Sequence, residues 1–97
     1  MFVLSAKLIF HIPCASSLKD KRQVSRSLID RTRRRYNAAI AEVATQDVHR
    51  TLTIGVAVVS GDTAHAQRLL DEIIRYMEDS TNAELVEVEL SEAHRNG

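Results

Sequence analysis

The chain has one cysteine, one proline, three glycines and no tryptophan among its 97 residues. The single cysteine, Cys14, excludes a disulfide bond and a cluster of thiolate metal ligands within one chain. Only four residues are aromatic, so leucine, isoleucine, valine and alanine must pack most of the core. Apolar residues still make up 44% of the chain, which is enough for the modest core of a single domain.

Long hydrophobic runs are missing as well. No segment approaches the roughly 20 apolar residues that cross a bilayer as a helix. The first twelve residues, MFVLSAKLIFHI, lack the basic start of a secretory signal, and Ser5, Lys7 and His11 interrupt their apolar residues. We therefore expect a soluble, cytoplasmic, bacterial-type protein that does not bind a membrane.

The residues that usually carry metal or nucleophilic catalysis are scattered. The histidines show neither His-x₃-His nor His-Glu-x-x-His spacing, which metal sites on helices require. Cys14 has no identifiable histidine or acidic partner. We expect no metal, no cofactor, no catalytic residue and a protein that is not an enzyme. The histidines are His11, His49, His65 and His94.

Two hydrophobic periodicities alternate along the chain. Apolar residues at every second position predict strands, and apolar residues spaced three and four apart predict helices. Ser17, followed three residues later by Asp20, is a variant of the capping box that begins a helix. In the last strand, Val86, Val88 and Leu90 are predicted to face inward. The predicted elements are strand 2–12, helix 18–36, strands 38–45 and 51–59, helix 63–79 and strand 84–90.

This order, βαββαβ, predicts an α+β, ferredoxin-like sandwich. Right-handed crossovers place the first and third strands at the centre of a four-stranded antiparallel sheet of order 4-1-3-2, with both helices on one face. The charged second and fourth strands suit the edges, where charge discourages unwanted pairing. We expect one domain over residues 1–91 and a disordered tail over 92–97.

The charge is neutral in total and uneven along the chain. Residues 1–50 carry ten Lys or Arg and four Asp or Glu, whereas residues 51–97 carry three and nine. Such asymmetry indicates either an anionic partner for the first half or self-association of opposite faces, unless folding interleaves the two halves.

The first predicted helix concentrates the positive charge. At 100° per residue, Lys19, Arg22, Arg26 and Arg33 lie within about 60° of one another, with Arg34 close by. Repeated cations along one line suit a phosphate backbone, because affinity comes from releasing several counterions together. The spacing is not a code for reading bases. The alternative interpretation is a solvated helix face without a partner.

Lys21 falls inside the apolar arc of the same helix. Its stem either covers the edge of the core while the ammonium reaches solvent, or it folds over the helix start. In the second case Cys14, Ser16, Ser17 and Lys21 would form a small-anion or enzyme site, which we keep as a minor alternative.

The uncovered face of the sheet has no aromatic residue on its two central strands, so it cannot stack bases as RNA-binding sheets do. It is small, flat and partly apolar, which favours packing against a second subunit. The predicted homodimer contacts are Val3, Ile9, Ala57, Val59 and Leu85.

Three segments resemble the YlxP-like family of small uncharacterised bacterial proteins: SLKDKRQVSRSL at the first helix, AEVATQD in the second strand, and IGVAVVSGD before the second helix. The resemblance covers about residues 2–90. It implies a ferredoxin-like fold and, because genes of the family often lie among translation-initiation and ribosome-maturation genes, a role near RNA or the ribosome. It implies no catalytic residue.

Two hypotheses result. In the first, a non-enzymatic module binds rRNA or a ribosomal particle through Lys19, Arg22, Arg26, Arg33 and Arg34, with Lys21 in support. In the second, a homodimeric protein-interaction module uses the open sheet face and binds no nucleic acid.

Overall fold

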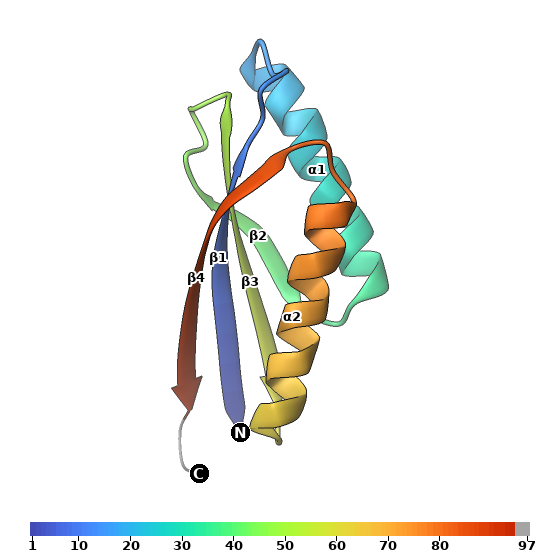
Figure 1. The fold of residues 1–97 in the computed structure, drawn as a ribbon, viewed down its shortest axis with the longest axis vertical. Helices are drawn as coiled ribbons and strands as arrows, with labels where there is room; N and C mark the ends of the chain where they lie inside the picture. Colours follow the sequence, from blue (N-terminus) through green and yellow to red (C-terminus); the bar gives the residue numbers. More distant parts are fainter. Residues whose placement is uncertain (95–97) are drawn as a thin grey trace.

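The computed structural model describes residues 1–94, and side chains as far as residue 91. Four antiparallel strands form one sheet in the order β2-β3-β1-β4, and both helices lie on the same side of it (Figure 1). This order is the predicted one, and it confirms the ferredoxin-like sandwich. The elements are β1 (Phe2–His11), α1 (Leu18–Arg35), β2 (Ala39–Ala44), β3 (Thr51–Ser60), α2 (Thr63–Asp79) and β4 (Glu84–His94).

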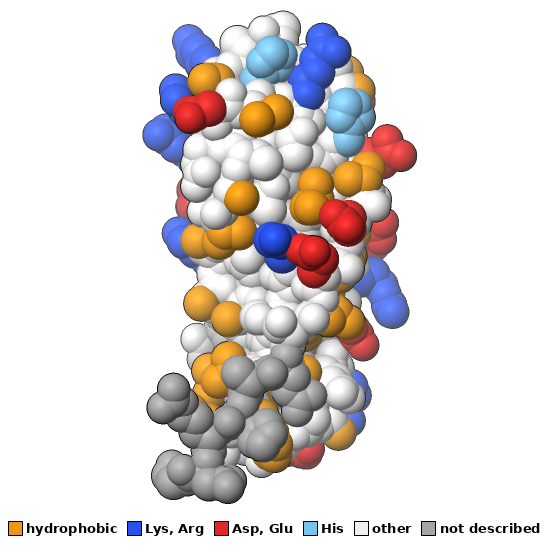
Figure 2. All heavy atoms as spheres, turned by 90° about the vertical axis from the view of Figure 1, so that its left-hand side faces the viewer, with side chains coloured by type: hydrophobic (Ala, Val, Ile, Leu, Met, Phe, Trp, Pro, Cys, Tyr) orange, Lys and Arg blue, Asp and Glu red, His pale blue; other side chains and the backbone are white. Residues whose placement is uncertain are grey.

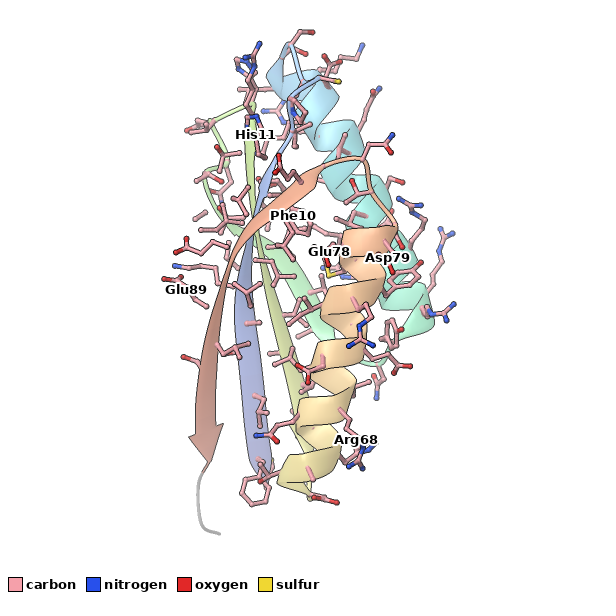
Figure 3. All side chains as sticks on the ribbon, viewed as in Figure 1. Phe10, His11, Arg68, Glu78, Asp79 and Glu89 are labelled. Atoms are coloured by element: carbon pink, nitrogen blue, oxygen red, sulfur yellow. The ribbon has the colours of Figure 1, made fainter. Side chains whose placement is uncertain are left out.

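The core lies between the sheet and the helices. Alternate residues of β1 and β3 point toward the helices because side chains in a strand alternate between its two faces. Phe10, one of these residues, is directed into this space (Figure 3). The core side of α2 buries Ala66, Leu70, Ile73 and Met77, at the three- and four-residue spacing that predicts a helix. None of the helices in the described part is long and apolar enough to cross a membrane.

The start of α1 confirms Ser17 as the cap residue. The second half of the capping box differs, because the Asp20 carboxylate bonds Ser16 and not the N–H of Ser17. The Ser17 hydroxyl accepts a hydrogen bond from the Asp20 N–H at 3.1 Å. The Asp20 carboxylate reaches Ser16, one residue before the cap, and accepts from its N–H at 3.0 Å and its hydroxyl at 2.7 Å. The first bond satisfies a backbone donor that the helix start would leave without a partner, and the bonds to Ser16 tie the preceding residue to the first turn, so the entry into α1 is fixed.

The strand β4 departs from expectation in its register. The pairing with β1 shifts between Ile9 and Phe10, so that Ile9 lies opposite Glu87 and Phe10 opposite Leu85, with Val86 as the extra residue. Such a bulge leaves the extra residue out of the ladder. The prediction that Val86 faces inward was therefore wrong, and its side chain is exposed.

Beyond the bulge, Val88 and Leu90 lie opposite Leu8 and Ala6, on the helix-facing side as predicted. They nevertheless stay 40% and 66% exposed. The reason is that α2 packs mainly on β1 and β3 and does not extend over the edge strand.

The C-terminal boundary was also placed too early. The strand β4 continues through His94, so residues 92–94 belong to the sheet and not to a tail. The remainder of the predicted tail, 95–97, lies outside the described residues.

Candidate nucleic-acid interface

The helix α1 presents three different sides. One side packs against the sheet and buries Leu28, Ile29 and Thr32. A second side contacts α2, and a third points away from both layers. Arginines occupy the second and third sides, and their contacts determine which of them are available to a partner.

The arginines that face α2 are engaged in the fold. Arg31 donates from Nη2 to the carbonyl of Ser80, at the end of α2, at 2.8 Å. The Arg35 guanidinium lies 5.7 Å and 5.0 Å from the ring centroids of Tyr36 and Tyr76, within the range of a cation–π contact. Its Nε donates to the Tyr36 hydroxyl, and this hydrogen bond raises the pKa of Arg35. These two side chains join the helices.

The outward side carries the predicted basic stripe, which comprises Lys19, Arg22, Arg26, Arg33 and Arg34. All five side chains are exposed. Among the described residues, Lys19, Arg22, Arg26 and Arg34 have no hydrogen-bond or ion-pair partner in the fold. Their charges are therefore available to an external anion.

Arg33 is held in place. Its Nε donates to the carbonyl of Ile40 in β2 at 3.1 Å, and Nη2 donates to the same oxygen. A guanidinium has five N–H donors, so at least three still point elsewhere. Arg33 is thus a positioned cation at the border between α1 and β2.

The acidic Asp20 acts on the stripe only at Lys19, its neighbour in sequence. Its carboxylate accepts hydrogen bonds from the Ser16 hydroxyl and N–H, which lower its pKa and keep it ionised, and the charge of Lys19 also lowers this pKa. It lies about 100° or more around the helix from Lys19, Arg22 and Arg26. Asp30, which is exposed, interrupts the stripe, because it lies between Lys19 and Arg34 around the helix.

Lys21 corrects the sequence prediction. The side chain is only 1% exposed, so its ammonium neither reaches solvent nor folds over the helix start. It donates to the carbonyls of Thr45 and Val48, the latter at 2.9 Å, in the loop between β2 and β3. It also lies 2.9 Å from Oε2 of Glu42. Lys21 therefore belongs to the fold and cannot support phosphate binding.

Sequence reasoning missed this ion pair, although both partners gave a signal. Lys21 falls in the apolar arc of its helix. Glu42 lies two residues after the buried Ile40, so both side chains face the same side of the strand. Opposite charges that are both predicted to face inward should be considered as a pair, because a buried charge needs a partner. The charge of the second strand, which is Glu42, therefore serves as the partner of Lys21 and not only as the edge charge that the sequence predicts.

The small-anion site of the minor alternative is not assembled. Lys21 points to the β2–β3 loop, and Ser16 and Ser17 are bonded to Asp20. Cys14 is exposed. A cavity beside α1 is lined by Cys14 but not by the two serines or Lys21.

The open sheet face, on the side of the sheet away from the helices, has a hollow across its middle. Ser5 lies beside Ser91 in β4 and Ala57 in β3, and Ala57 lies beside Ala39 in β2, so four small side chains form one row. They line a shallow depression. Figure 2 shows this face with apolar side chains scattered over it and few charges at its centre.

Four of the five predicted dimer contacts lie on this face: Val3, Ile9, Ala57 and Val59. Leu85 does not. It pairs with the buried Phe10 and packs against the core on the helix side, because the bulge at Val86 changes the register. The prediction for Leu85 was wrong.

The uneven charge of the sequence persists in space. The basic stripe lies on α1 beside β2 at one edge of the sheet, whereas β4 at the opposite edge carries Glu84, Glu87 and Glu89. In Figure 2 the Lys and Arg side chains predominate along the left margin, whereas Asp and Glu side chains alternate with Lys and Arg along the right margin. The molecule is therefore polarised from edge to edge.

Comparison with known proteins gives a family and a fold. The family model described as "Protein of unknown function (DUF503)" matches residues 3–90. The chain is 28% identical over 64 residues to "Uncharacterized protein YlxP" of Bacillus subtilis (strain 168), an alignment that covers 66% of this chain and 70% of that protein.

Two designed proteins resemble it in fold. The de novo designed protein Foldit4 matches with a TM-score of 0.53 at 14% identity, over 99% of this chain and 100% of that one. The de novo designed protein LFR1 1, with a ferredoxin fold, matches with a TM-score of 0.54 at 19% identity, over 100% and 88%.

Proposed function

The chain belongs to the DUF503 family of proteins of unknown function, and from its own surface we propose that it is a non-enzymatic module that binds structured RNA, such as rRNA in a ribosomal particle. The binding surface is the outward side of α1, with Lys19, Arg22, Arg26, Arg33 and Arg34. The YlxP-like resemblance, with its translation-related gene neighbourhood, points in the same direction.

The observation that carries this proposal is the division of arginines between two sides of one helix. Arg31 and Arg35 are used to attach α1 to α2. Arg22 and Arg26, one turn apart, have no partner among the described residues and remain solvated. When such a row of cations binds an RNA backbone, it displaces the counterions that are condensed on the phosphates. The release of these counterions is the main source of the binding free energy.

The geometry fits a phosphate backbone and not individual bases. From Lys19 to Arg33 the helix rises about 21 Å, at 1.5 Å per residue, so the stripe spans several phosphates. An α-helix cannot enter the deep, narrow major groove of A-form RNA, and no aromatic residue lies on this side for stacking. Positioning by shape and charge, without sequence readout, is the expected mode.

A matched pair of charge reversals tests the proposal. The variant Arg22→Glu/Arg26→Glu changes the stripe, whereas Arg68→Glu/Arg75→Glu makes the same change in net charge on exposed residues of α2. We expect the first variant to lose co-sedimentation with ribosomal particles and binding to an rRNA fragment, and the second to retain most of both. Circular dichroism should show that both variants are folded.

Equal losses in the two variants would show that only net charge matters and would contradict the assignment to α1. Undiminished binding of the Arg22→Glu/Arg26→Glu variant would contradict the proposal as a whole.

A second candidate function is a homodimeric interaction module, and the uncovered sheet face favours it. Four strands at about 4.8 Å spacing and some eight residues at about 3.3 Å give a face of about 500 Å² per copy. Two copies would bury about 1,000 Å², at the low end for a specific interface. Val59, which is 62% exposed, lies on this face.

The dimer is tested by light scattering on the wild-type chain and on Val59→Glu. A dimeric mass that falls to that of a monomer in the variant would support this function. A monomeric wild type at about 100 μM would exclude a stable dimer, and RNA binding would be unaffected because it uses α1.

A further inference from the structure

The two edges of the sheet differ in how far they are protected. At the β2 edge, the strand has six residues and an irregular register after Glu42. The guanidinium of Arg33 covers the carbonyl of Ile40, and Lys21 is bound to Glu42. This edge is therefore short, interrupted and covered by side chains of α1, which is how proteins prevent strands from adding to a sheet.

The β4 edge has a bulge and acidic residues, which also discourage unwanted pairing, but it is longer than the β2 edge, and no helix side chain is bonded to its carbonyls among the described residues. The strand has eleven residues, and beyond the bulge at Val86 it pairs regularly with β1 from Glu87 onward. On its other side no strand is paired with it among the described residues. About every second residue of an antiparallel edge strand directs its N–H and C=O away from the sheet. These groups form a template for a further strand.

Apolar side chains accompany this template on the helix-facing side. Val88 and Leu90 are exposed because α2 leaves the edge strand uncovered. A groove between β4 and α2 continues this surface, with apolar residues at its base and Asp71 on its helix side. The groove is lined by Leu4, Gln67, Leu70, Asp71, Leu90 and Ser91.

Acidic side chains accompany the template on the open face. Glu87 and Glu89 alternate with the apolar residues, and Glu89 points away from the helices, opposite in direction to Phe10 (Figure 3). Glu89 is paired with Lys7 at 2.9 Å, but more than half of its side chain remains exposed. Glu87 has no ion-pair partner among the described residues.

We propose that an extended segment of a partner protein, with alternating apolar and basic residues, adds to β4 as a fifth strand. Its apolar residues would lie over Val88 and Leu90 and its basic residues beside Glu87 and Glu89. Main-chain hydrogen bonds give such an addition its affinity, and alternate side chains give it specificity. This edge is separate from α1, so the inference does not rest on RNA binding.

A second copy of the chain fits this edge poorly. Antiparallel pairing that brings Val88 against its own copy sets Glu87 opposite Glu89. Pairing that brings Val88 against Leu90 sets Glu89 opposite itself. Like charges directly opposite one another destabilise a ladder, so these two registers disfavour a second copy, whereas basic side chains of a partner meet no like charge at Glu87 and Glu89.

The experiment uses the full chain and a labelled, end-capped peptide of four Lys-Val repeats, with fluorescence anisotropy as the readout. A Lys₄Val₄ peptide has the same composition without alternation, and four Glu-Val repeats reverse the charge. We expect the Lys-Val peptide to bind at least tenfold more tightly than either control. Amide NMR shifts should change along residues 87–91.

Two matched variants locate the site. Leu90→Lys places a charge at a 66% exposed apolar position of β4, and Val59→Lys does the same at a 62% exposed position of the open face. We expect Leu90→Lys to weaken binding at least tenfold and Val59→Lys to change it less than threefold. The Arg22→Glu/Arg26→Glu variant should bind the peptide normally.

Equal affinity for Lys-Val and Lys₄Val₄ would overturn the proposal, because charge alone would then suffice. Absence of binding at 1 mM peptide, or undiminished binding by Leu90→Lys, would also overturn it. A wild-type dimer that dissociates on Leu90→Lys would assign the edge to a second copy and equally contradict a basic partner.

Discussion

Removing the ammonium of Lys21 tests how the β2–β3 loop is held against α1. The variant Lys21→Met keeps most of the apolar stem and removes the ammonium that binds Glu42 and the carbonyls of Thr45 and Val48. Each carbonyl keeps a backbone N–H donor, and Glu42 keeps the Ser25 hydroxyl at 3.5 Å, so the main loss is the opposite charge beside Glu42. Breaking a buried ion pair from one side costs about 3–5 kcal/mol, because the other charge stays behind. Glu42 is 21% exposed and regains some hydration, so we expect a loss of about 3 kcal/mol in the free energy of unfolding.

This loss is large for a small domain. A chain of this length has a total stability of about 5–15 kcal/mol, and each kcal/mol shifts the melting temperature by about 4–8 °C. The melting temperature of Lys21→Met should therefore fall by about 12–24 °C. Urea unfolding at pH 7, followed by circular dichroism, gives the free energy directly.

The double variant Lys21→Met/Glu42→Gln supplies the control. Neutralising Glu42 removes the uncompensated charge, so the double variant should be more stable than Lys21→Met alone. A loss below about 1 kcal/mol in Lys21→Met, or no recovery in the double variant, would refute the assignment of Lys21 to a buried ion pair.

Two further predictions concern the sheet and the helix start. A Cβ on Gly55 would lie 2.8 Å from Cγ1 of Val43, so Gly55→Ala should lower the free energy of unfolding of the wild type. The loss should be smaller in a Val43→Ala background, because the clashing side chain is then shortened. Urea unfolding measures both losses, and equal losses in the two backgrounds would contradict this contact. Hydrogen bonds from Ser16 lower the pKa of Asp20 below 3.8, so its contribution to stability is complete above that pH and is lost as the pH falls through the lower, folded-state pKa. The stability difference between wild type and Asp20→Asn should shrink as the pH falls below 3.8, and a difference that grows on acidification would contradict the role of Asp20.

Much of the fold follows from local patterns. The order of strands and helices is readable because apolar residues recur at period two in β1 and β3 and at helical spacing in α2. The cap at Ser17 follows from the preference of hydroxyl side chains for helix starts. These features depend on neighbours in sequence, so a single sequence contains them.

What the sequence did not reveal depends on contacts between distant segments. The partners of Lys21 lie 21 or more residues away, in β2 and the loop that follows it. The bulge at Val86 is a property of the pairing between β4 and β1, and it moved Leu85 from the open face to the core. The exposure of Leu90 depends on how far α2 extends over the sheet. Periodicity alone cannot report any of these.

The candidate site was predicted in part for the same reason. The exposed positions of Lys19, Arg22 and Arg26 follow from the helical wheel and agree with the structure. The wheel does not show that Arg31 and Arg35 are bound to α2 or that Arg33 is bound to the carbonyl of Ile40. These contacts separate the arginines that hold the fold together from those left for a partner.

The salt dependence of RNA affinity tests the central claim most directly. If the stripe binds about three to four phosphates, the slope of log K against log salt should be about −2 to −3.5 for the wild type, taking 0.7 to 0.9 per phosphate. The variant Arg22→Gln/Arg26→Gln should reduce the magnitude of that slope by about 1.5. The control variant Arg68→Gln/Arg75→Gln should leave the slope nearly unchanged. A wild-type slope near zero, or the same slope in Arg22→Gln/Arg26→Gln as in the wild type, would contradict binding of phosphates by α1.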